Sequence, residues 1–150
     1  MLSMFIRFTR SNLLVITQAI IVSIIMAISL TACSEPPYSN LDNKQLKTML
    51  EQNVPIFDVR RLDEWKQTGV VEGSKLLTFV DSSGRMNPDF IKRFSSIVNK
   101  NDPVILICRT GNRTSTLARL LVEQMGFTQV YNVRNGITHW IGEKRPVKYL

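Results

Sequence analysis

The hydrophobic positions of the chain alternate between short apolar runs and longer stretches with helical spacing. Buried strands are predicted at 56–59, 104–107 and 129–133, because these runs are short and rich in β-branched or aromatic residues. A further strand is expected at 75–80. Apolar residues at helical spacing lie between and after these strands. Such alternation predicts an α/β sandwich with a mostly parallel sheet.

Residues with capping chemistry mark where these helices should begin. The expected caps are Asp42 with Gln45 as its capping-box partner, Asp63, Asn87 before Pro88 and Asp89, and Thr114 or Ser115. The apolar faces comprise Leu46, Met49, Leu50, Phe90, Ile91, Phe94, Ile97, Val98, Leu117, Leu120, Leu121, Met125, Ile137, Trp140 and Ile141.

The first 32 residues have the composition of a secretory signal peptide. A basic start precedes an apolar stretch at 13–30, and small residues stand directly before Cys33. The alternative is an uncleaved membrane helix, because a stretch of this length can nearly span a bilayer. The polar, proline-containing segment 33–40 is predicted to be a tether or linker, and 41–150 the folded domain.

The ending Leu30-Thr31-Ala32-Cys33 resembles a bacterial lipobox. That resemblance implies cleavage before Cys33 and lipidation of Cys33. The protein would then be a lipid-anchored lipoprotein of the bacterial cell envelope, facing the periplasm and attached to the membrane through its N-terminus. Ser34 favours the outer membrane over the inner one.

Charge and composition narrow the classes of partner. The formal net charge is +7, but the cations are scattered rather than gathered into a stripe with aromatic residues. Nucleic-acid binding is therefore not expected, whereas an anionic small-molecule substrate is. The two cysteines and the one histidine lie far apart in sequence, so no metal site is predicted.

The most informative stretch is 104–119, which reads VILICRTGNRTSTLAR. Cys108 ends the predicted strand, and the polar loop 109–113 leads into a helix. A helix N-terminus, a loop of backbone N–H groups and two arginines all favour a thiolate, which is the nucleophilic form of cysteine. The structural alternative is a small buried hydrophobic residue. Gly111 and the arginines so close to Cys108 favour chemistry.

Four blocks of sequence, in order, resemble the rhodanese family of sulfurtransferases. They are Asp58-Val59-Arg60 with Glu64-Trp65, Gly69 through Gly73-Ser74, Cys108 through Thr114, and Val130–Val133 with Gly136, Ile137 and Trp140. Together they cover roughly 42–147. The chain departs from the family pattern at Val70, where histidine is usual, at Asn135, where glycine is usual, and mildly at Ser74.

The resemblance implies a three-layer sandwich with about five strands and a sulfurtransferase activity of the thiosulfate type. Cys108 would accept a sulfane sulfur and carry it as a persulfide. Substrate binding would fall to the rest of the loop, Arg109, Thr110, Gly111, Asn112 and Arg113. The substrates would be a small anionic sulfur donor and a thiol or cyanide-like acceptor. The resemblance implies neither a cofactor nor a metal.

Three charged residues are expected to support the site. Asp58 ends a buried strand, so it should accept loop hydrogen bonds or pair with an arginine. Arg60 and Glu64 are expected to form an ion pair with each other. Trp65 and Trp140 are expected to be packing residues. No motif links His139 to Cys108.

Two other functions stay open at this point. One is a persulfide carrier or redox sensor that acts with a protein partner, such as a protein sulfur acceptor. The other is a cysteine phosphatase, whose signature has five residues between cysteine and arginine. Here only four separate Cys108 from Arg113, and the shorter loop favours sulfur over phosphate because an anion cradle must fit its ligand.

Overall fold

The computed structural model describes residues 15, 17, 18 and 35–150. Most of the expected signal peptide and the lipidation site Cys33 lie outside the described residues, so both stay predictions. Within the described part of the chain, no helix is both long enough and apolar enough to cross a membrane. Residues 36–150 form one compact unit.

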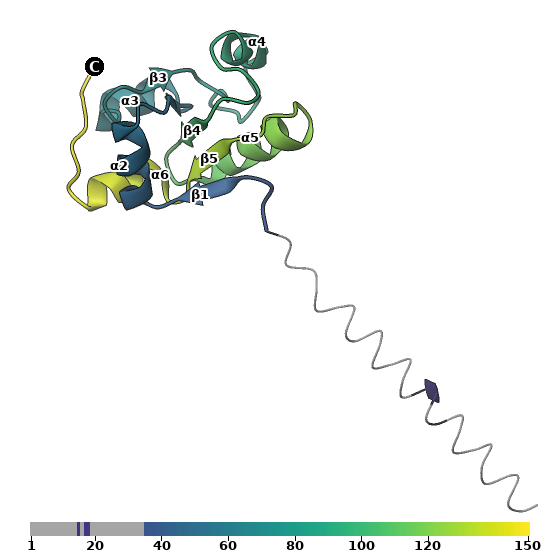
Figure 1. Cartoon of the computed structure of the whole chain (residues 1–150). Helices are drawn as coiled ribbons and strands as arrows, with labels where there is room; N and C mark the ends of the chain where they lie inside the picture. The colour runs from purple at the N-terminus through teal and green to yellow at the C-terminus, as the bar shows by residue number, and fades with distance from the viewer. Residues whose placement is uncertain (1–14, 16, 19–34) are drawn as a thin grey trace, which may run out of the picture. The chain divides into compact units, whose positions relative to one another are not determined.

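This unit is built on a five-stranded parallel sheet (Figure 1). Its strands are β1 (Ser39–Leu41), β2 (Ile56–Asp58), β3 (Lys75–Leu76), β4 (Val104–Ile107) and β5 (Val130–Val133). They lie in the order β1-β5-β4-β2-β3, and every neighbouring pair is parallel. The predicted α/β class and parallel sheet are therefore confirmed.

Within residues 36–150, four helices connect the strands and a fifth follows β5, and together they cover both faces of the sheet (Figure 1). They are α2 (Asn43–Glu51), α3 (Leu62–Thr68), α4 (Phe90–Ser95), α5 (Asn112–Glu123) and α6 (Gly136–Gly142). Side chains of α4 and α5 join one hydrophobic cluster, and those of α2 and α6 join a second. The predicted three-layer arrangement follows from these two cores.

Alternation along β4 shows how one strand serves both cores. Val104 and Leu106 belong to the cluster under α4 and α5, whereas Ile105 and Ile107 belong to the cluster under α2 and α6. Successive side chains of a strand point to opposite faces, so a strand buried on both sides must be apolar throughout. This is why 104–107 is a continuous apolar run.

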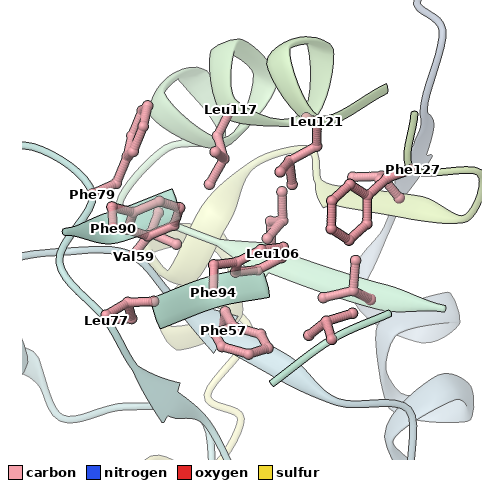
Figure 2. Close-up of a cluster of buried hydrophobic side chains, with 14 of the residues drawn as sticks. Phe57, Val59, Leu77, Phe79, Phe90, Phe94, Leu106, Leu117, Leu121 and Phe127 are labelled. Atoms are coloured by element: carbon pink, nitrogen blue, oxygen red, sulfur yellow. The ribbon is translucent and has the colours of Figure 1, made fainter. Parts of the chain in front are cut away.

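The first core is rich in aromatic rings (Figure 2). The ring of Phe94 lies 4.8 Å from that of Phe57, 5.7 Å from that of Phe90 and 5.6 Å from that of Phe127. Phe94 thus joins α4 to β2 and to the segment before β5. Burial of such large rings contributes much of the stability of a small domain.

Two strands differ from their predicted extent. β1 begins at Ser39, inside the segment expected to be linker, and pairs with β5. β3 ends at Leu76 instead of continuing to residue 80. Beyond it, Leu77 and Phe79 turn into the core, and Val80 pairs with Met86 across a tight turn. The backbone still bonds to the end of β2, since Leu77 N and Phe79 N donate to the carbonyls of Asp58 and Val59, each over 3.1 Å.

The helix starts were only partly predicted. Asp42 and Gln45 form the expected capping box, with Gln45 N donating to Asp42 Oδ1 at 2.7 Å. Asp63 is not a cap, because α3 begins at Leu62 and the Asp63 carboxylate accepts hydrogen bonds from the Arg61 side chain.

Two later helices also begin elsewhere than predicted. α4 begins only at Phe90, and the Asn87 side chain accepts a hydrogen bond from Asp89 N in the preceding turn. α5 begins at Asn112, two residues before the expected caps Thr114 and Ser115. Their hydroxyl groups bind other partners, described below.

Two residues of the predicted apolar faces, Ile97 and Ile141, are exposed rather than buried. Ile97 lies just beyond the end of α4, where the chain leaves the helical path.

Replacing Phe94 by alanine should lower the free energy of unfolding by about 3–5 kcal/mol, because the change leaves a cavity among three other rings. Ile97→Ala is the matched control, since Ile97 is 50% exposed, and it should change stability by no more than about 0.5 kcal/mol. Urea unfolding monitored by circular dichroism measures both values. Equal losses in the two variants would contradict the placement of α4.

Candidate active site

Cys108 directly follows β4, near the middle of the sheet, and its side chain is 1% exposed. The chain passes from Cys108 through Gly111 into α5 within a few residues. In parallel sheets the carboxyl ends of central strands are where ligands bind. Cys108 therefore lies at the carboxyl end of a central strand, as predicted from the sequence.

Two groups of the loop and helix contact the Cys108 sulfur. Gly111 N donates to Sγ over 3.2 Å, and the hydroxyl Oγ1 of Thr114 lies 3.3 Å from Sγ. The N-terminus of α5 adds partial positive charge beside them. An N–H donor and a helix N-terminus are both groups that stabilise negative charge beside them.

Thr114 is a site residue that the sequence analysis missed. It is fully buried, and its hydroxyl also donates to the Gly111 carbonyl over 3.0 Å. A threonine near a helix start is usually interpreted as a cap. The sequence showed a threonine beside the loop, but the position at which α5 begins determines that its hydroxyl contacts the sulfur instead of capping the helix.

The loop is fixed from behind by the turn between β5 and α6. Ile137 N donates to the Cys108 carbonyl over 2.9 Å, and Thr138 N donates to the Arg109 carbonyl over 3.1 Å. Gly136 adopts φ of +59°, and a Cβ there would overlap both carbonyl groups. Gly136 is therefore a second residue on which the site depends, although it stands far from Cys108 in sequence.

Gly111 has a similar constraint on the other side of the same contact. Its φ is +89°, and a Cβ there would overlap the Arg134 carbonyl oxygen. Only glycine adopts this backbone conformation readily and leaves room for the neighbouring chain. The loop and the β5–α6 turn thus fit together backbone against backbone.

The other predicted substrate-binding residues differ in accessibility. Arg109, Thr110 and Asn112 are exposed, whereas Arg113 is only partly so. Arg109 lines a cavity of about 260 Å³ beside Ile137 and also one of about 460 Å³. Its guanidinium makes no hydrogen bond or ion pair with any other residue that the structure describes.

Arg113 is bound to Glu64 by two hydrogen bonds. Its Nη1 donates to Glu64 Oε2 over 2.8 Å and its Nη2 to Oε1 over 2.5 Å. Glu64 Oε2 also accepts from Arg61 N at 3.1 Å. The expected ion pair between Arg60 and Glu64 is wrong, because the Arg60 guanidinium contacts only the backbone carbonyl of Glu64, at 3.4 Å.

Opposing effects set the ionisation of Glu64. Its burial on its own would raise the pKa of the carboxyl group, but the hydrogen bonds from Arg113 and Arg61 and the charges of both arginines outweigh burial. The pKa of Glu64 therefore lies below its ordinary value. The same pair raises the pKa of Arg113, because the hydrogen bonds to Glu64 and the charge of that carboxylate favour the charged guanidinium.

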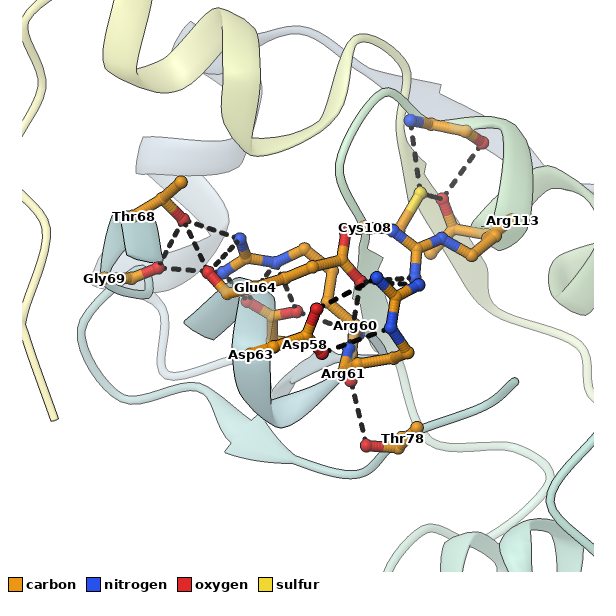
Figure 3. Close-up of polar contacts among 12 residues, drawn as sticks. Asp58, Arg60, Arg61, Asp63, Glu64, Thr68, Gly69, Thr78, Cys108 and Arg113 are labelled. Atoms are coloured by element: carbon orange, nitrogen blue, oxygen red, sulfur yellow. Dashed lines mark hydrogen bonds and ion pairs between the residues drawn. The ribbon is translucent and has the colours of Figure 1, made fainter. Parts of the chain in front are cut away.

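Arg60 instead pairs with Asp58, in full burial (Figure 3). Nε and Nη2 of Arg60 donate to the two Asp58 oxygens over 2.9 and 2.7 Å. The remaining donors reach the Thr68 hydroxyl and the Gly69 carbonyl. This confirms the expectation that Asp58 pairs with an arginine. Such a buried pair is stable only because every donor has an acceptor.

Other candidates lie away from the sulfur. Trp65 and Trp140 are buried, as expected of packing residues. His139 is paired with Glu143 at 3.1 Å on an exposed side of α6. Across 35–150 and the three described residues before it, no three histidine, cysteine or acidic side chains are grouped as metal ligands would be.

Comparisons with known proteins agree with this geometry. The family model described as Rhodanese-like domain matches residues 42–143. The chain is 31% identical over 123 residues to Rhodanese-like domain-containing protein 17 of Arabidopsis thaliana, covering 79% of this chain and 78% of that protein. It is 29% identical over 113 residues to Thiosulfate sulfurtransferase 18 of the same plant, covering 72% of this chain and 82% of that protein.

The fold also matches solved structures. One is the polysulfide-sulfur transferase homodimer from Wolinella succinogenes, with a TM-score of 0.61 and 23% sequence identity. The match covers 76% of this chain and 80% of that one. At this identity the likeness shows the fold alone.

Gly136→Ala should lower the free energy of unfolding by more than about 1 kcal/mol, because the added methyl group meets two carbonyls and the backbone is left-handed. Alkylation of Cys108 should also slow, since the loop must move away from the turn. Gly142→Ala in the same helix is the control, because a Cβ there meets nothing within 4 Å. Thermal unfolding and iodoacetamide kinetics give the two readouts. A variant that matches the control in both would refute the role of this contact.

Glu64→Gln should lower the free energy of unfolding at pH 7 by about 2 kcal/mol, since charged hydrogen bonds are lost. The folded-state pKa of Glu64 is lowered from 4.5, so its stabilisation is complete above that pH and disappears as pH falls through the folded-state value. The gap between wild type and variant should therefore shrink below pH 4.5. Urea unfolding at several pH values measures it, with the exposed Glu123→Gln as control. A gap that widens in acid would be the contrary result.

Proposed function

We propose, because this chain belongs to the rhodanese-like domain family, that it is a sulfurtransferase that carries sulfur as a persulfide on Cys108. The donor would be an anionic sulfane compound such as thiosulfate, and the acceptor a thiol or a cyanide-like nucleophile. The observation that carries this proposal is the Cys108 sulfur itself. It accepts a hydrogen bond from Gly111 N, contacts the Thr114 hydroxyl and lies beside the N-terminus of α5.

The reaction would proceed in two half-reactions. In the first, the Cys108 thiolate attacks the outer sulfur of the donor, a new S–S bond forms, and the donor's own S–S bond breaks. For thiosulfate, sulfite leaves with the electron pair. In the second, the acceptor attacks the outer sulfur, and Cys108 leaves as thiolate. A nucleophile that divides the transfer in this way gives ping-pong kinetics.

Donor binding would depend more on Arg109 than on Arg113. Arg113 already uses two donors on Glu64, whereas the Arg109 guanidinium is uncommitted among the described residues and lines both cavities. A guanidinium binds oxyanions with paired hydrogen bonds. Arg113 would instead hold α5 against α3 and contribute positive charge near the sulfur.

The names of similar proteins point in the same direction. One relative is named a thiosulfate sulfurtransferase, and one structural neighbour a polysulfide-sulfur transferase. These names describe those proteins. For this chain they support sulfur transfer as the reaction class, and they leave thiosulfate, polysulfide and protein-bound sulfur as donors that experiment must separate.

The full-length chain carrying Cys33→Ser, purified in detergent, tests the proposal, because Cys108 is then its only cysteine. Intact mass after incubation with thiosulfate should rise by about 32 Da, the mass of one sulfur atom, and cyanide should reverse the gain. The variant that also carries Cys108→Ser should show no gain and should keep the same thermal unfolding midpoint.

A different outcome would redirect the assignment. If Cys108 is alkylated by iodoacetamide but gains no sulfur from thiosulfate, the thiosulfate donor is wrong. Inorganic polysulfide is then the next donor to try. No gain from either would overturn small-molecule sulfur transfer and favour a redox sensor or a carrier loaded by a protein partner.

A further inference from the structure

We infer that the Thr114 hydroxyl is a switch that turns from the Gly111 carbonyl to the Cys108 sulfur whenever that sulfur becomes anionic. The switch deepens the proposed function and rests on it for its role in turnover. Ionisation of the thiol alone is enough to operate it. Three contacts around a single buried hydroxyl carry the inference.

The first step is the direction of each hydrogen bond. A threonine hydroxyl has one proton to donate and lone pairs to accept. Oγ1 of Thr114 lies 3.0 Å from the Gly111 carbonyl oxygen, which can only accept, so the hydroxyl proton points there. Toward Sγ, 3.3 Å away, the same oxygen can then only accept. The arrangement therefore fits a protonated Cys108 that donates its S–H to Thr114.

Loss of the thiol proton reverses that requirement. A thiolate only accepts, so a Thr114 oxygen that faces it with a lone pair would be repelled. Thr114 is 0% exposed, so water cannot readily take the place of its hydroxyl. Rotation of the hydroxyl about its C–O bond supplies a donor to the sulfur beside the existing one from Gly111 N.

The rotation costs little because the Gly111 carbonyl keeps another partner. Ser115 N donates to the same oxygen over 2.9 Å. A buried carbonyl with one hydrogen bond is adequately satisfied. The hydroxyl is thus the one donor in this cluster that is free to leave, whereas Ser115 N is fixed by the helix.

The switch would act on both half-reactions of sulfur transfer. In the first, the thiol proton passes to a base in solution, the hydroxyl turns to Sγ, and the thiolate attacks. Once the persulfide forms, negative charge resides on the outer sulfur, and the hydroxyl returns to Gly111. When the acceptor takes the outer sulfur, Sγ regains the electron pair of the broken S–S bond, and the hydroxyl turns back to stabilise it.

These roles predict unequal effects on the two steps. Loss of the hydrogen bond makes the Cys108 thiolate less abundant at neutral pH but more nucleophilic. At high pH, where abundance no longer limits the rate, the transfer of sulfur from the donor to Cys108 should change by less than about threefold. Discharge of the persulfide has no such compensation, because Cys108 is then the leaving group. It should slow by about tenfold when the hydroxyl is removed.

The test uses the full-length Cys33→Ser chain in detergent and the rate of iodoacetamide alkylation from pH 5 to pH 10. Thr114→Val removes the hydroxyl while keeping the shape, and should move the midpoint of the pH–rate profile upward by about one unit. Thr114→Ser should restore the original midpoint. Thr48→Val is the matched control on α2, where the hydroxyl is exposed and donates to Lys44 O. A Thr114→Val midpoint equal to that of the control would overturn the switch.

A second measurement holds even if the valine variant does not fold. The S–H stretching band of Cys108 in the Cys33→Ser chain should show, at low pH, the lowered frequency of a donating thiol. A band at the frequency of a free thiol would overturn the inference. Alkylation and infrared spectra need no sulfur donor. A chain that shows the shift but never gains sulfur would therefore keep the switch and refute the proposed function.

Discussion

The contact between the active-site loop and the β5–α6 turn positions everything else in the site. Two backbone N–H groups of α6 hold the carbonyls of Cys108 and Arg109, and Gly111 and Gly136 remove the side chains that would separate the two segments. With both carbonyls fixed from behind, Gly111 N donates to the Cys108 sulfur on the other side of the loop. Backbone hydrogen bonds of this kind are directional, so the loop keeps its shape without a ligand.

The pairing of two carboxylates, those of Asp58 and Glu64, determines which arginines near this loop are neutralised. The buried Asp58–Arg60 pair closes the end of β2 and joins it to the start of the turn at Gly69. Glu64 on α3 then engages Arg113 on α5 (Figure 3). These carboxylates are occupied, and the guanidinium of Arg109, which lines two cavities, has no partner among the residues that the structure describes. Opposite charges thus neutralise one another inside the domain and leave a cation where an anionic donor would arrive.

Two neighbouring hydroxyl groups of α5, those of Thr114 and Ser115, bind different partners. Ser115 pairs with the Tyr38 hydroxyl at 2.6 Å, which ties the segment before β1 to the active-site helix. Thr114 points inward to the sulfur instead. Consecutive helical residues project about 100° apart, so the two hydroxyl groups point in different directions. A single residue of difference decides which hydroxyl lies beside the sulfur.

The sequence by itself determined the class of the fold and singled out Cys108 as the candidate nucleophile. Apolar runs such as 104–107 and the helical spacing between them require a parallel sheet covered on both faces, because no other arrangement buries both sides of such strands. The cysteine at the end of the central run, with glycine and arginines after it, marked the site. These features are local, and local patterns can be interpreted without knowing which segments meet.

Only the tertiary structure decided the partners. Spacing along the chain favoured a pair between Arg60 and Glu64, but the backbone beyond β2 directs Arg60 back to Asp58 and leaves Glu64 for an arginine 49 residues away. The same holds for Gly136, whose need for a bare backbone comes from the loop against which it packs. Contacts between distant segments depend on angles and register that no short window of sequence contains. The fold was therefore predictable from the hydrophobic pattern of the sequence, whereas the partners of its charged side chains and hydroxyl groups were not.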